Sequence, residues 1–100
     1  MTRVKLASVR TFPSARPDKE HALKPLEEAA EVFGAWQLMR DTTDAGLNPK
    51  YEMADLMDEI ADTIQACCNL AASLGVTDLT PYLARCEERN RKRGRYEQVH

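Results

Sequence analysis

The sequence of 100 residues contains little glycine and few aromatic side chains, with four Gly and 6% Phe, Trp and Tyr. Its hydrophobic fraction is nevertheless 43%, a balance that favours α-helices. A chain of this length buries only about two thirds of the surface that its unfolded form exposes. We therefore expect one small helical domain whose remaining apolar stripes are covered by a second subunit.

The chain also lacks the features of a secreted or membrane-spanning protein. Its three cysteines, two of them adjacent at Cys67 and Cys68, do not form a disulfide framework, and we interpret them as small core residues in a reducing compartment. No apolar run approaches the roughly 18 residues of a membrane span, and the segment MTRVKLASVR has no signal-peptide core. A net charge of -2 is too small to indicate a nucleic-acid or membrane partner, and we do not expect a nucleic-acid partner. The sequence thus predicts a cytoplasmic protein with no membrane partner.

Lysine and arginine are entirely missing between Lys50 and Arg85. Within this gap, residues 51–74 have the periodicity of a helix with one broad apolar side. The other side carries four acids, Asp55, Asp58, Glu59 and Asp62. These carboxylates repel one another, because none has a basic neighbour at i+3 or i+4. Positive charge must come from elsewhere, either from a basic segment of the protein or from a metal ion.

Prolines and turn residues divide the chain into three parts. Residues 1–20 are assigned to an N-terminal arm, in which Pro13 and Pro17 favour extended structure over TFPSARPD. The preceding VKLASV is compatible with either a short strand or coil. Residues 21–97 form the helical domain, and residues 98–100 form a short C-terminal tail.

The first two predicted helices are joined by a polar connector at residues 41–48. The first helix covers residues 23–40. Either Pro25 lies in its first turn, where no backbone donor is lost, or a short turn at residues 21–24 precedes the helix with a kink. The second has Asn48 as its N-cap and Pro49 at its first helical position. It runs to residue 74, where Gly75 ends it.

A third helix opens at Thr80 and Pro81 and is stopped by Gly94. Because a short link joins the first two helices, they are expected to pack as an antiparallel hairpin. The predicted fold is therefore all-α: a helical hairpin plus a third helix, with a four-helix-bundle-type core completed by oligomerisation.

Two pairs of carboxylates have the spacing that places both members on one helix face. Glu28 and Glu31 form the first pair, and Glu59 and Asp62 form the second. An antiparallel hairpin brings the two pairs face to face. Four oxygen ligands at one site suit Mg²⁺ or Mn²⁺, which also bind substrate phosphates. From the residues alone, a solvated face or an ion-pair surface that meets the basic tail is an equal alternative.

With these motifs in place, the sequence resembles the all-α nucleoside triphosphate pyrophosphohydrolases, the MazG-like superfamily. The resemblance covers about residues 22–96. Its hallmark is E-E-x-x-E followed by E-x-x-D after a variable spacer, here supplied by Glu27, Glu28, Glu31, Glu59 and Asp62. The resemblance implies a Mg²⁺-dependent enzyme that converts a nucleoside triphosphate, (d)NTP, to the monophosphate and pyrophosphate. It also implies a homodimer or homotetramer.

The resemblance assigns metal ligation to Glu28, Glu31, Glu59 and Asp62, with Mg²⁺ as the cofactor and Mn²⁺ as a substitute. Glu31 is our candidate for the base that takes a proton from the attacking water. Two groups of weaker candidates complete the site. Lys92 and Arg95 are candidates for phosphate binding, and His21 and Trp36 are candidates for base contacts, although Trp36 is better interpreted as a core residue.

Two alternative functions remain open at this point. The cluster of cations in residues 89–95 is compatible with a non-enzymatic helical dimer that binds nucleic acid or a protein partner through its basic tail. A phosphoribosyl-ATP pyrophosphohydrolase shares the same arrangement of carboxylates on helices.

Overall fold

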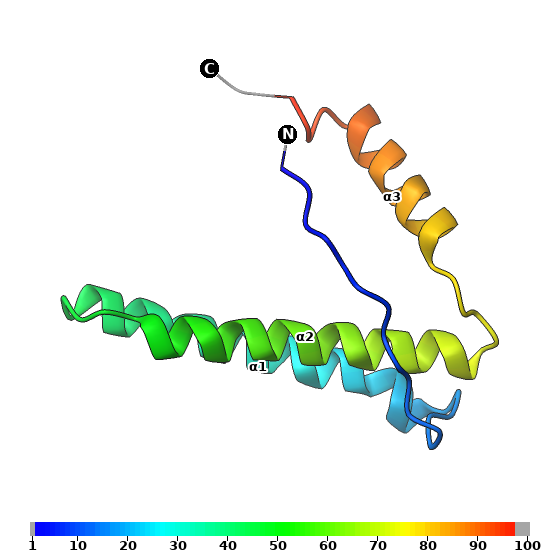
Figure 1. The fold of residues 1–100 in the computed structure, drawn as a ribbon, viewed down its shortest axis with the longest axis horizontal. Helices are drawn as coiled ribbons and strands as arrows, with labels where there is room; N and C mark the ends of the chain where they lie inside the picture. Colours follow the sequence, from blue (N-terminus) through cyan, green and yellow to red (C-terminus); the bar gives the residue numbers. More distant parts are fainter. Residues whose placement is uncertain (1, 98–100) are drawn as a thin grey trace.

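The computed structural model describes residues 2–97, which form three α-helices and no strand (Figure 1). The helices are α1 (Lys19–Asp44), α2 (Lys50–Ser73) and α3 (Thr80–Lys92). The prediction of an all-α fold is confirmed. The predicted tail at residues 98–100 lies outside the described residues.

The first helix is longer than predicted at both ends. Its N-cap is Asp18, whose side chain accepts a hydrogen bond from the backbone N–H of His21 at 2.9 Å. This cap starts the helix at Lys19, so the predicted start at residue 23 is wrong. Pro25 consequently lies inside the helix rather than in its first turn, at the cost of one backbone hydrogen bond. The predicted end at residue 40 is also wrong, because helical hydrogen bonding continues to Asp44.

The connection between α1 and α2 is shorter than the predicted connector. Pro49, not Asn48, occupies the N-cap position of α2, and no side-chain hydrogen bond caps this helix end. The Thr42 hydroxyl donates to the Glu52 carboxylate at 3.1 Å and links the end of α1 to the start of α2. At the other end of α2, Gly75 has φ of +86° and follows the last turn, which confirms the predicted C-terminal glycine.

Helices α1 and α2 lie side by side and antiparallel, as predicted (Figure 1). Among the described residues, only Leu56 and Ala66 of α2 are buried hydrophobics. The apolar stripe of α2 that includes Met53, Met57 and Ile60 stays open, with Met57 49% exposed. The hairpin therefore leaves its principal hydrophobic surface uncovered.

The third helix stands away from the hairpin and does not pack on α1 or α2 (Figure 1). The radius of gyration is 16.5 Å, whereas a compact domain of this length has about 13 Å. The exposed surface of 8365 Å² exceeds the value of about 5,700 Å² for a compact monomer of this mass. Two predicted core residues are exposed as a result: Cys67 lies on the surface, and Trp36 is 45% exposed while it stacks on Phe33.

The N-terminal arm is extended and crosses α2 (Figure 1). Two hydrogen bonds hold it there: Gln65 Nε2 donates to the Arg10 carbonyl at 2.9 Å, and the Phe12 N–H donates to Asn69 Oδ1 at 3.0 Å. An ion pair of 2.8 Å between Arg3 and Glu87 joins the arm to α3. The arm ends at Asp18 rather than at residue 20, because α1 starts early.

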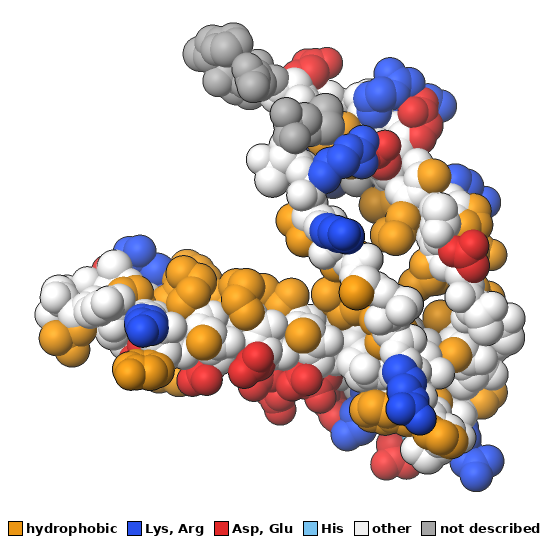
Figure 2. All heavy atoms as spheres, in the orientation of Figure 1, with side chains coloured by type: hydrophobic (Ala, Val, Ile, Leu, Met, Phe, Trp, Pro, Cys, Tyr) orange, Lys and Arg blue, Asp and Glu red, His pale blue; other side chains and the backbone are white. Residues whose placement is uncertain are grey.

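Charged and apolar side chains occupy opposite edges of the hairpin. Figure 2 shows acidic side chains gathered along the lower edge and hydrophobic side chains along the upper edge, on the side of α3. None of the helices in residues 2–97 is both long and apolar enough to cross a membrane.

Candidate functional site

Three acids from the two hairpin helices meet at one point. Glu28 comes from α1, and Glu59 and Asp62 come from adjacent turns of α2. One carboxylate oxygen of each lies within 4.8 Å of the others. Glu28 and Glu59 are partly buried between the helices, whereas Asp62 is exposed. The spacing of each pair and the antiparallel packing together produce this cluster.

Glu31 lies beside this group of three rather than within it. The pKa of Glu59 is raised first by a side-chain hydrogen bond with Glu31, then by burial and by the neighbouring negative charges. The pKa of Glu28 is raised first by burial and then by the charge of Glu31 and a hydrogen bond with it. In both cases the neighbouring carboxylate favours the protonated form, because two ionised carboxylates repel each other. Glu31 therefore adjoins both Glu28 and Glu59.

The Glu59 side chain lacks a partner for one of its oxygens. Its Oε2 atom is buried and has no hydrogen-bond partner among the described residues. A buried ionised oxygen without a donor is costly unless a cation or a proton satisfies it. Carboxylate oxygens are the ligands that Mg²⁺ prefers, so the residues present fit a magnesium ion. Glu28, Glu59 and Asp62 are the side chains that could hold it.

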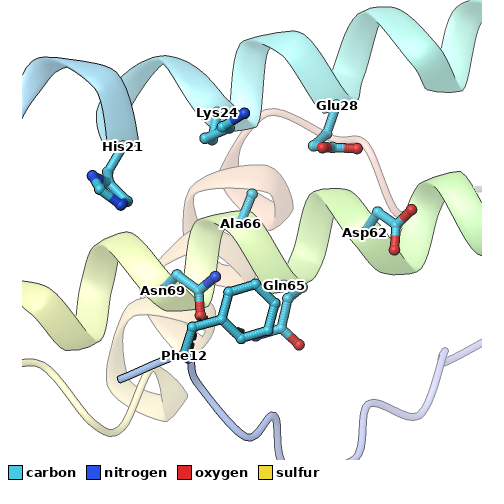
Figure 3. A pocket seen from close by; sticks show the side chains of 8 residues that line it. All are labelled: Phe12, His21, Lys24, Glu28, Asp62, Gln65, Ala66 and Asn69. Carbon is cyan, nitrogen blue, oxygen red and sulfur yellow. Dashed lines mark hydrogen bonds between the residues drawn. The ribbon is translucent and has the colours of Figure 1, made fainter. Parts of the chain in front are cut away.

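A cavity of about 300 Å³ continues from the acidic cluster along the groove between α1 and α2 (Figure 3). Glu28 and Asp62 lie at one end, and His21 and Asn69 lie at the other. The lining residues come from the arm and both hairpin helices: Phe12, His21, Lys24, Glu28, Asp62, Gln65, Ala66 and Asn69. Lys24 is the one lysine or arginine among these lining residues, and its amine pairs with Glu27 at 3.2 Å.

The remaining predicted site residues are divided between this cavity and distant surfaces. His21 lines the cavity, and its Nδ1 lies 2.6 Å from the Asp18 carboxylate. Trp36 is absent from the lining. Lys92 and Arg95 belong to α3 and the turn after it, which do not pack on the hairpin within one chain. Arg95 donates instead to the Asn90 side chain at 3.1 Å.

Five residues that line the cavity are not among the predicted site residues: Phe12, Lys24, Gln65, Ala66 and Asn69. Gln65 and Asn69 follow Asp62 at i+3 and i+7, so the helical period of α2 was a usable signal for both. Lys24 precedes Glu28 by one turn and carries the same signal on α1. Phe12 had none, because the path of an extended arm is set by tertiary hydrogen bonds and not by local periodicity.

No family model, curated protein or solved structure matches this chain.

Proposed function

We propose that this chain is a Mg²⁺-dependent nucleoside triphosphate pyrophosphohydrolase that acts in house-cleaning or in control of the nucleotide pool. The proposal is carried by one observation: three carboxylates from two helices converge within 4.8 Å, and two of them come from a stretch of α2 that contains no lysine or arginine. Such a cluster is stable when a divalent cation neutralises it. The adjoining cavity offers space for the organic part of a nucleotide.

Each carboxylate has a role in this proposal. Glu28, Glu59 and Asp62 would hold the ion, and Mn²⁺ would serve in place of Mg²⁺. When bound, the ion would neutralise the triphosphate and lower the pKa of the attacking water. Glu31 adjoins Glu28 and Glu59 and is the residue that we assign to accept the proton of this water.

The proposed enzyme works as a homodimer or homotetramer. The exposed surface exceeds that of a compact monomer by roughly 2,600 Å², which is in the range that obligate interfaces bury. Assembly would complete a four-helix-bundle-type core over the open stripe of α2. It would also pack α3 against a hairpin, and Lys92 and Arg95 bind the phosphates only if this packing brings them to the acidic cluster.

The test is pyrophosphate release from a panel of canonical and modified dNTPs and phosphoribosyl-ATP in MgCl₂. We expect Glu59→Ala and Asp62→Asn to lower turnover by more than about 100-fold, because each removes a proposed metal ligand. Asp55→Asn is the matched control. It removes the same charge two turns from Asp62 on the same side of α2 and should leave turnover near that of the wild type.

Two outcomes would contradict the proposal, and a third would change the substrate that it names. If no substrate yields pyrophosphate, the protein is not a pyrophosphohydrolase. Binding of nucleic acid that weakens with salt and in Lys92→Ala, and that is indifferent to Mg²⁺, would favour the helical dimer with a basic tail instead. Turnover of phosphoribosyl-ATP alone would assign the chain to that single reaction.

A further inference from the structure

The end of the cavity farthest from the acids is built around the side-chain amide of Asn69, whose orientation is fixed by the N-terminal arm. Asn69 Oδ1 accepts from the Phe12 backbone N–H at 3.0 Å and from Gln65 Nε2 at 3.0 Å. A backbone N–H is only a donor, so the atom that it meets must be the amide oxygen. The amide nitrogen therefore points the other way.

The nitrogen of Asn69 faces the cavity. Figure 3 shows this atom directed toward Ala66, while the oxygen is directed toward Phe12. No hydrogen bond among the described residues engages Asn69 Nδ2. Because the arm occupies the oxygen, Asn69 offers the cavity a hydrogen-bond donor and no acceptor.

On the α1 side of the same cavity end, His21 offers a hydrogen-bond acceptor. Its Nδ1 lies 2.6 Å from Asp18 Oδ1. The pKa of Asp18 is lowered, chiefly by its hydrogen bonds with His21, so the carboxylate is ionised and accepts the Nδ1 proton. In the neutral ring, Nε2 is then the acceptor.

The shape of this cavity end suits a flat ring. Ala66 has a small side chain and is 9% exposed, so a ring can approach the backbone of α2 closely. The Phe12 ring lines the same space and offers an aromatic face on which a base can stack. Asn69 and Asp62 are seven residues apart, or about 10 Å along α2, which leaves room for a sugar between the ring and a phosphate at the acids.

We propose that this cavity end is a nucleobase subsite that selects keto bases over amino bases. The inference rests on the proposed function, because it treats the acidic cluster as the phosphate end of the same ligand. A keto oxygen accepts from Asn69 Nδ2, and the adjacent ring N–H of uracil or hypoxanthine donates to an acceptor such as His21 Nε2. Cytosine and adenine carry an amino group in place of the keto oxygen, so two donors face each other.

The experiment measures binding of nucleoside monophosphates without divalent metal, in EDTA, by NMR titration. Two pairs differ in the keto or amino group: dUMP against dCMP, and dIMP against dAMP. We expect each keto nucleotide to bind about tenfold more tightly, the effect of leaving one donor unpaired. The side-chain NH₂ resonances of Asn69 should shift with dUMP and not with dCMP.

Asn69→Asp tests the polarity directly. The aspartate keeps an oxygen for the Phe12 N–H but presents a second oxygen to the cavity, so the preference should be lost or reversed toward dCMP. Asn48→Asp adds the same charge in the connection between α1 and α2 and should keep the wild-type preference. Equal affinity of the wild type for both members of each pair overturns the inference, even if Asn69→Asp does not fold. So does a keto preference that survives in folded Asn69→Asp.

The outcomes separate this inference from the proposed hydrolysis. Pyrophosphate release without a keto preference would contradict the proposed subsite and support the proposed enzymatic activity. A keto preference without pyrophosphate release would support the proposed subsite and contradict the proposed enzymatic activity.

Discussion

Glu59 is held in an environment that disfavours its charge. Its pKa is raised by the hydrogen bond with Glu31, by burial and by the charges of Glu31, Asp62 and Glu28. The pKa of Glu28 is raised as well. In the pH range just above the ordinary pKa of glutamate, the folded chain therefore binds more protons than the unfolded chain, and its stability falls as pH rises through this range.

Glu59→Gln should remove much of this dependence. In EDTA, the variant is expected to have a higher melting temperature than the wild type at neutral pH. Its melting temperature should also depend less on pH in the range just above the ordinary pKa of glutamate, where the raised pKa of Glu59 acts. Thermal unfolding followed by circular dichroism measures both. Asp58→Asn removes the same charge from an exposed neighbour and should keep the wild-type slope. A slope that stays unchanged in Glu59→Gln would mean that the carboxylates do not interact.

Two glycines have opposite backbone requirements. Gly75 has φ of +86° after the end of α2, a conformation that costs other residues about 1 kcal/mol, so Gly75→Ala should destabilise the protein by about that amount. Gly34 lies within α1 with no atom within 4 Å of an added Cβ, so Gly34→Ala should stabilise it by about 0.5–1 kcal/mol. Urea unfolding of both variants provides the check. The same sign for both changes would contradict the assigned helix boundaries.

At the scale of the helices, the hydrophobic periodicity predicted the helix faces better than it predicted the helix ends. The acids and the apolar residues of α2 separate onto two sides, and the antiparallel hairpin that joins Glu28 to Asp62 followed from the short connection. Helix ends were predicted less well, because Asp18 directly follows Pro17 at the end of the N-terminal arm, and this position concealed its role as a cap. The cavity was not predicted, because one of its walls is formed by this arm and local periodicity does not reveal the path of the arm.

The whole molecule is an open arrangement whose hydrophobic surface is not covered within one chain. Periodicity cannot predict where a third helix packs, and α3 does not pack on its own hairpin. The same openness explains why Trp36 and Cys67, predicted as core residues, are exposed in the single chain.

Met57→Glu should prevent assembly, because it places a charge in the open stripe of α2. We expect light scattering after gel filtration to give a dimer or tetramer for the wild type and a monomer or unfolded chain for the variant. Leu47→Glu adds the same charge in the connection between α1 and α2, where Leu47 is 65% exposed, and should assemble normally. A monomeric wild type that unfolds cooperatively would contradict an oligomeric core.

The most direct test of the account is a crystal of the protein soaked in manganese, with anomalous scattering used to locate the ion. The account predicts a manganese peak in coordination contact with Glu28, Glu59 and Asp62, with Glu31 beside it. A saturating soak in which these carboxylates point apart into solvent, with no ion between them, would contradict it.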